Sequence, residues 1–168
     1  MKRIIVIGCP GSGKSVLSTS LGQITKIPLY HLDMMYWNAD KTTVSREIFL
    51  SRLREVLSED EWIIDGNYSF SMEMRISACD TVIFLDYPTD VCIDGVRGRI
   101  GTKRIDMPWV ETEEDAEFME YIKAFSKSQK PEILALIDRY REQKEIIILK
   151  SREEAARLLL KLRKDSEK

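Results

Sequence analysis

Apolar residues along this chain form short unbroken runs, and most stretches between the runs show apolar positions at helical spacing. An unbroken run indicates a strand that is covered on both faces, because a strand with one face in water alternates apolar and polar residues. The runs therefore predict buried strands at about 2–7, 27–32, 62–68, 81–88 and 145–149.

Helical periodicity fills most of the intervals between these strands. Val16, Leu17, Leu21 and Ile24 would share one face of a helix that ends near 22–25. Further helices are expected at about 46–58, 90–99 and 113–127, from Pro131 onward, and after the capping box at 151–154. Strands that alternate with helices in this way predict an α/β fold with a parallel sheet.

The composition is that of a globular protein, with 43% apolar and 32% charged residues. A chain of 168 residues without a linker or repeat is expected to form one domain, 1–168. The net charge of −2, with mixed signs throughout, gives no bulk attraction to nucleic acid or to an anionic membrane. The three cysteines form no metal-binding pattern, and no apolar run is long enough to span a membrane. We therefore expect a cytoplasmic protein that binds neither nucleic acid nor membrane directly, while the oligomeric state stays open.

The segment between the first strand and the first helix carries the strongest chemical signal. Its sequence, GCPGSGKS, fits the phosphate-loop pattern G-x-x-x-x-G-K-[ST] at every fixed position. The glycines let backbone N–H groups point inward toward a polyphosphate, and the following helix adds its positive N-terminal end. Lys14 would reach the β- and γ-phosphates, and Ser15 would ligate Mg²⁺. The residues expected to contact ATP here are Gly8, Pro10, Gly11, Ser12, Gly13, Lys14, Ser15 and Val16.

Three predicted strands end in an aspartate, at the edge where open α/β sheets bind ligands. Asp65 is favoured for the metal, because an apolar strand that runs into aspartate is typical of a Walker B site. Asp33 is favoured for acceptor contact, because Tyr36 and Trp37 beside it could stack on a ring. Asp86 is interpreted as a turn or helix-capping residue. Spacing alone does not separate Asp65 from Asp86 as the metal ligand.

Three further polar residues belong to this end of the predicted sheet. His31, the only histidine, is interpreted as a packed or supporting residue, because phosphoryl transfer depends on positioning and charge more than on proton shuttling. Asn67 follows the third strand and is counted with the acceptor contacts. Arg75 lies after the same strand, where an acceptor phosphate could bind.

The segment at 97–111 is basic and turn-rich, and we interpret it as an insertion over the site. Arg97, Arg99 and Arg104 are candidates to neutralise charge on the transferring phosphoryl group, because a planar guanidinium holds phosphate at two points. The neighbouring glycines would let such a lid swing and exclude water. The alternative is a solvated surface loop.

Several runs of this sequence resemble those of a known protein family. The runs His31–Trp37, Trp62–Tyr68 and Met74–Asp86 look like those of the FlaR-type DNA topology modulation proteins, which are adenylate-kinase-like P-loop proteins. The similarity covers nearly the whole chain and continues through 104–107, 117–118, 130–134 and 146–152.

This resemblance implies the nucleoside monophosphate kinase fold. That fold is a three-layer P-loop NTPase domain with a five-stranded parallel sheet of order 2-3-1-4-5, helices on both faces, and a lid insertion at about 97–127. The resemblance also implies that Asp65 is the acidic strand end of that superfamily and that Arg99 is the arginine at the base of the lid. It places the turn that contains Arg152 near the adenine.

Together these features predict an ATP-dependent kinase of a small acceptor, with nucleotides and nucleoside-like compounds favoured. ATP and Mg²⁺ are the expected cofactors, and the lack of an Asn-Lys-x-Asp motif argues against GTP. The expected catalytic residues are Lys14, Asp33, Arg99 and Arg104.

Two positions depart from the family pattern and favour an alternative. Gly95 stands where an arginine is expected, and Trp109 begins a segment where a cysteine is expected. The alternative is a nucleotide-binding regulator that affects DNA topology or gene expression through partners, with little or no turnover. A plain NTPase is a third hypothesis.

Overall fold

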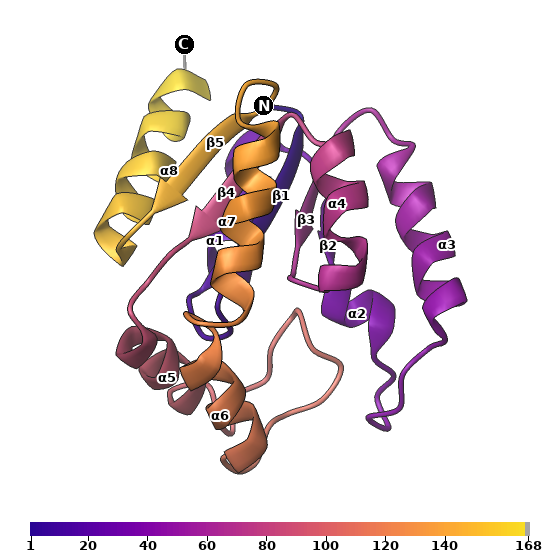
Figure 1. The fold of residues 1–168 in the computed structure, drawn as a ribbon, viewed down its shortest axis with the longest axis vertical. Helices are drawn as coiled ribbons and strands as arrows, with labels where there is room; N and C mark the ends of the chain where they lie inside the picture. The colour runs from indigo at the N-terminus through magenta and orange to yellow at the C-terminus, as the bar shows by residue number, and fades with distance from the viewer. Residues whose placement is uncertain (167–168) are drawn as a thin grey trace.

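The computed structural model describes residues 1–166 and contains a parallel sheet with the strand order β2-β3-β1-β4-β5 (Figure 1). Both the α/β class and this order agree with the predictions from the sequence. The strands are β1 (Arg3–Gly8), β2 (Leu29–His31), β3 (Trp62–Asp65), β4 (Thr81–Leu85) and β5 (Glu145–Leu149).

β1 lies at the centre of the sheet, where it pairs with β3 on one side and β4 on the other. Its apolar residues from Ile4 to Ile7 have no exposed surface, which explains why the run is unbroken. Because every pairing is parallel, the carboxyl ends of all the strands meet at one edge of the sheet.

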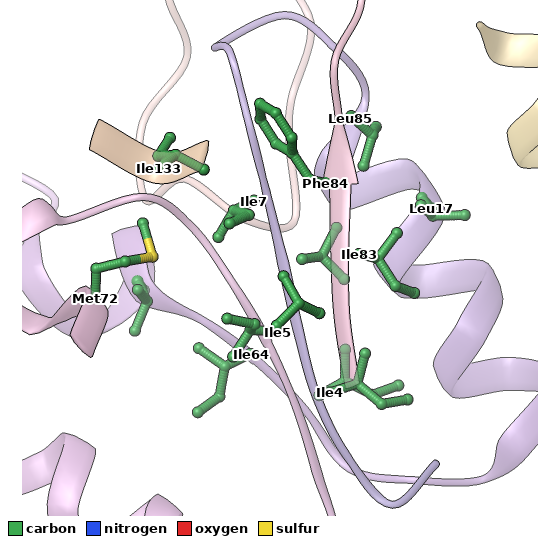
Figure 2. Packing of buried hydrophobic residues seen from close by; sticks show 14 of the residues in the cluster. Ile4, Ile5, Ile7, Leu17, Ile64, Met72, Ile83, Phe84, Leu85 and Ile133 are labelled. Atoms are coloured by element: carbon green, nitrogen blue, oxygen red, sulfur yellow. The ribbon is translucent and has the colours of Figure 1, made fainter. Parts of the chain in front are cut away.

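Helices cover both faces of the sheet and bury the side chains that alternate along its strands. α1 (Lys14–Thr25) contacts α8 (Arg152–Ser166) in one layer, while α4 (Ser69–Ala78) contacts both α3 (Arg46–Leu57) and α7 (Gln129–Tyr140) in the other. Figure 2 shows the consequence for the core. Leu85 lies with Leu17 of α1 on one side of the sheet, and Phe84 and Ile7 lie with Ile133 of α7 on the other.

The helices differ from the predictions in three places. α2 (Leu32–Tyr36) replaces the continuation of the second strand, because Leu and Met lack a β-branch and favour a helix. α4 was not predicted, because its buried face carries Ser71 and Arg75 and so shows little apolar periodicity. α7 begins two residues before Pro131, which a first turn tolerates because its N–H groups have no helical partner.

An insertion between β4 and β5 lies at the carboxyl ends of the strands (Figure 1). It consists of α5 (Thr89–Arg97), the connecting loop (98–115) and α6 (Ala116–Ala124), which is shorter than the helix predicted at 113–127. Within residues 1–166, no helix is long and apolar enough to cross a membrane.

Candidate active site

The phosphate-loop motif forms a tight curl between β1 and α1. Gly8, Gly11 and Gly13 all have positive φ values, 151°, 81° and 92° respectively, which glycine adopts without steric cost. α1 begins at Lys14, whose Nζ donates to the carbonyl oxygen of Cys9 at 3.2 Å and so lies over the loop. A curled backbone that leads into a helix N-terminus fits the oxygens of a polyphosphate.

The back of this loop lies directly against α5. A Cβ atom on Gly95 would lie 2.1 Å from the carbonyl oxygen of Gly11, and a Cβ atom on Gly11 would lie 2.0 Å from the carbonyl oxygen of Cys92. No side chain fits at position 95 unless the helix or the loop moves. Packing therefore explains why glycine stands where the family resemblance predicts arginine.

We expect Gly95→Ala to lower the free energy of unfolding by about 1–3 kcal/mol, because the new methyl group must push α5 away from the phosphate loop. Urea unfolding monitored by circular dichroism measures the change. The matched control is Gly98→Ala, since a Cβ atom there meets nothing closer than the Asp94 carbonyl oxygen at 3.3 Å. Equal stability of the two variants would contradict this account of Gly95.

Cys9 turns its side chain into the core rather than toward the phosphate side of the loop. It is buried and belongs to the apolar core, as does Cys92 of α5. The interaction with the Cys92 thiol and burial raise the pKa of the Cys9 thiol, which keeps it protonated. The side chain therefore stabilises the loop and leaves binding to the backbone.

Asp65 and His31 form a pair at the carboxyl ends of two neighbouring strands. The two residues are in register across β3 and β2, and His31 Nδ1 lies 2.9 Å from Asp65 Oδ2. The Asp65 side chain is only 5% exposed, so the imidazole fixes its orientation. This contact agrees with the interpretation of His31 as a supporting residue.

Asp33 lies in the first turn of α2, where its Oδ1 accepts a hydrogen bond from the Tyr68 hydroxyl at 2.7 Å. Burial raises the pKa of Asp33, and the charges of Asp65 and Asp106 act in the same direction. The Tyr68 hydrogen bond and the charge of Lys14 oppose the rise. Asp33 therefore interacts electrostatically with Lys14 of the phosphate loop. A raised pKa also makes its carboxylate a stronger base.

Asp106 of the connecting loop reaches the phosphate loop, which the sequence did not predict. Ser15 Oγ donates to Asp106 Oδ2 at 2.5 Å, and Arg104 Nε donates to Asp106 Oδ1 at 2.9 Å. Burial acts to raise the pKa of Asp106, but the hydrogen bonds from Arg104 and Ser15 outweigh it and lower the pKa. Asp106 is therefore an ionised carboxylate at the entrance to the phosphate loop.

The three arginines predicted for the lid all form ion pairs within the insertion. Arg97 pairs with Glu114 at the surface, with 2.8 Å between Nε and Oε2. Arg99 holds Glu111 through Nε and Nη2, and Arg104 reaches the same carboxylate through Nη1 at 3.3 Å. Of the three, Arg104 is connected to the phosphate loop, through its pair with the Ser15-bound carboxylate.

Aromatic rings line the space between α2 and the connecting loop. Trp37 meets Trp109 edge to face at 5.2 Å between ring centroids, and Tyr36 contacts both Trp37 and Tyr68. Trp109, which departs from the family pattern, thus packs the connecting loop against the end of α2. We call Tyr36, Trp37, Tyr68 and Trp109 the aromatic wall.

Arg75 and Asn67, predicted as acceptor contacts, support the backbone instead. Arg75 has no exposed surface, and its guanidinium donates to the carbonyl oxygens of Gly66, Asn67 and Tyr68. Burial lowers its pKa to about 9. The Asn67 amide both accepts from the Gly8 N–H at 3.1 Å and donates to the Gly8 carbonyl at 2.8 Å. The structure therefore turns the Arg75 guanidinium toward the backbone and leaves it no exposed surface that an acceptor phosphate could contact.

Asp86 is held by two lysines. Its carboxylate pairs with Lys130 of α7 at 2.7 Å and with Lys150 after β5. Since β3 and β4 both flank β1, strand position does not separate Asp65 from Asp86, but these ion pairs leave Asp65 as the better metal candidate. Arg152, the first residue of α8, is exposed, and its charge acts on nearby Tyr87.

Within residues 1–166, no three or more His, Cys, Asp or Glu side chains are grouped as a metal site. That finding fits Mg²⁺, which usually keeps several water ligands and binds through one or two protein oxygens plus substrate phosphates. Ser15, at the start of α1, is in position to supply one of these oxygens.

No protein-family model matches the chain, and no curated protein matches it in sequence. Solved structures do match. Shikimate kinase from Bacteroides thetaiotaomicron is 18% identical over 99% of both chains, with a TM-score of 0.59. Shikimate kinase from Acinetobacter baumannii in complex with shikimate is 16% identical over 96% of this chain and 90% of that chain, with a TM-score of 0.60. A gluconokinase from Sinorhizobium meliloti 1021 is 12% identical over 98% and 94%, with a TM-score of 0.56.

At these identities the likeness concerns the fold alone. The assignment to the FlaR-type family stays a prediction, since these structures are shikimate kinases and a gluconokinase. The chain has the P-loop kinase fold of these small-molecule kinases, with the strand order 2-3-1-4-5.

Proposed function

We propose that the protein is an ATP-dependent kinase that transfers the γ-phosphoryl group to a hydroxyl of a small acceptor. The observation that carries this proposal is the position of Asp33. Its half-buried carboxylate, with a raised pKa, interacts electrostatically with Lys14 and lies beside the aromatic wall. A base next to the phosphate-loop lysine is the arrangement that phosphoryl transfer to a hydroxyl requires.

In this proposal each residue has a role that follows from its place. The backbone of 8–15 holds the phosphates, and Val16, exposed in the first turn of α1, borders them. Lys14 neutralises charge on the transferring group, and Asp33 orients the acceptor hydroxyl and accepts its proton. Mg²⁺ with Ser15 and Asp65 supplies further charge neutralisation when bound.

We further propose that 97–127 is a lid on the single domain 1–168. Closure would bring Arg99 and Arg104 toward the phosphates, at the cost of exchanging their present partner, Glu111, for phosphate oxygens. A closed lid would also keep water from the reacting phosphoryl group. Arg152 would then border the base of ATP from the other side.

The acceptor in this proposal has a ring and no acidic group. We infer the ring from the aromatic wall, whose half-buried side chains lie beside Asp33 and are of the type that packs against rings. Three arginines have other partners: Arg75 holds backbone carbonyls, Arg46 lies over Phe70, and Arg52 donates to the Met35 carbonyl. A phosphate or carboxylate on the acceptor would meet the like charge of Asp33, while Lys14 serves the phosphates of ATP and Arg104 is paired with Asp106 and Glu111.

Transfer of labelled phosphate from ATP with Mg²⁺ tests the proposal. The acceptor panel would contain nucleosides, nucleoside monophosphates, shikimate and gluconate, beside an acceptor-free control. We expect a labelled product above the control, strongest for the uncharged nucleosides. ATP binding without transfer to any acceptor would overturn the kinase and favour the regulatory alternative.

A further inference from the structure

We propose that Asp106, carried by the connecting loop, is a ligand of the metal ion that accompanies the nucleotide, next to Ser15. This inference rests on the proposed function, because it concerns the same metal–nucleotide site. It adds a metal ligand that comes from the insertion rather than from the sheet.

The distance between the two oxygens carries the inference. Ser15 Oγ and Asp106 Oδ2 are 2.5 Å apart. Neighbouring ligands of an octahedral Mg²⁺, each at about 2.1 Å from the ion, lie about 3.0 Å apart. The two oxygens therefore need to separate by only about 0.5 Å to become adjacent ligands of one ion. The hydrogen bond that Ser15 Oγ now donates to Asp106 Oδ2 would be broken, and the cation would lie between the two oxygens.

The surroundings of Asp106 favour a charged, oriented ligand. Its side chain is 7% exposed, and Arg104 donates to both of its oxygens, through Nε and Nη2. Glu111 accepts from Arg104 Nη1 at 3.3 Å and holds the guanidinium from the other side. Such second contacts fix the orientation of a metal-binding carboxylate.

Asp65 is less well placed for direct contact with an ion at Ser15. Its Oδ2 lies against His31 Nδ1, and within residues 1–166 no hydrogen bond joins Asp65 to Ser15. Asp65 can then hold a metal-bound water, while Asp106 binds the ion itself. A ligand on the connecting loop would couple metal binding to the position of that loop. Because Trp109 of the loop contacts Trp37, tryptophan fluorescence can report a change in that position.

The test compares binding of a non-hydrolysable ATP analogue in excess EDTA and in saturating Mg²⁺, by calorimetry and tryptophan fluorescence. In the unmodified protein Mg²⁺ should tighten binding. Asp106→Asn should reduce this metal-dependent gain by about 10-fold or more. Binding in EDTA should be unchanged or tighter, because a negative charge near the phosphates is gone. Glu114→Gln, which breaks the surface ion pair with Arg97 and leaves every contact of Asp106 intact, should keep the gain.

A second variant guards against a purely structural effect. Asp106→Cys should lose the gain with Mg²⁺ and recover it with Cd²⁺, because a thiolate prefers the softer ion. A gain in Asp106→Asn equal to that of the unmodified protein would overturn the inference and leave Asp106 as a latch on Ser15. An equal loss of affinity with and without metal would also overturn it. Failure of the unmodified protein to bind the analogue under either condition would instead overturn the proposed function.

Discussion

Replacement of Lys14 by methionine is expected to lower phosphoryl transfer by about 10³-fold or more and to leave the stability of the fold unchanged. Lys14 begins α1, and its Nζ donates to the Cys9 carbonyl at 3.2 Å over the phosphate loop. Methionine keeps the length of the side chain but removes the charge that would neutralise the β- and γ-phosphates. Labelled-phosphate transfer gives the rate, and urea unfolding gives the stability.

The control for this experiment is Lys123→Met, which removes a lysine from α6. Lys123 pairs with Glu120 at the surface, and an exposed pair of this kind contributes little to stability. We expect its activity and stability to match those of the unmodified protein. Turnover retained in Lys14→Met would exclude the phosphate loop as the catalytic centre, whatever the acceptor.

The features that sequence predicted correctly are local in the chain. The phosphate loop is a contiguous motif, and the buried strands β1, β3 and β4 each contain an unbroken apolar run, so neighbouring residues carry the whole signal. The edge strands β2 and β5 are only half-buried, although their sequences also predicted buried strands. The strand order came from the family resemblance, and β1 in the centre agrees with it. Asp33 and Asp65 were selected because each lies at the end of a predicted strand, at the edge where ligands bind, and their roles stay predictions.

The features that sequence could not show are contacts between distant residues. Ser15 and Asp106 are 91 positions apart, and His31 and Asp65 are 34 apart. Nothing in the residues around Asp106 marks it as a partner of the phosphate loop. The need for glycine at position 95 was not visible for the same reason, because the Gly11 carbonyl that excludes a side chain there is distant in sequence. The burial of Arg75 was also not visible, because a fully buried arginine looks, in sequence, like one that binds a ligand.

Asp33→Asn is expected to have opposite effects on activity and on stability. The neutral amide cannot accept the acceptor proton, so transfer should fall by about 10²–10⁴-fold. Asp33 is half-buried with a raised pKa, so its ionised form is disfavoured in the folded state relative to the unfolded state. Folding stability from this group is present below the unfolded pKa and is lost as pH rises through the folded pKa. At neutral pH the asparagine variant, which carries no charge, should therefore unfold at a higher temperature than the unmodified protein.

The pH dependence separates this account from a general packing effect. The stability advantage of Asp33→Asn should disappear at low pH, where the aspartate is protonated in both states. The unmodified enzyme should gain activity with rising pH, with a midpoint above the usual range of an aspartate, and the residual activity of the variant should lack that rise. Asp138→Asn, at an exposed carboxylate on α7, should show neither effect. A variant that loses activity without gaining stability at neutral pH would mean that Asp33 is not held ionised against its burial. A variant that keeps its activity would instead pass the role of base to another carboxylate of the site, and Asp65 and Asp106 are the candidates because their charges act on Asp33.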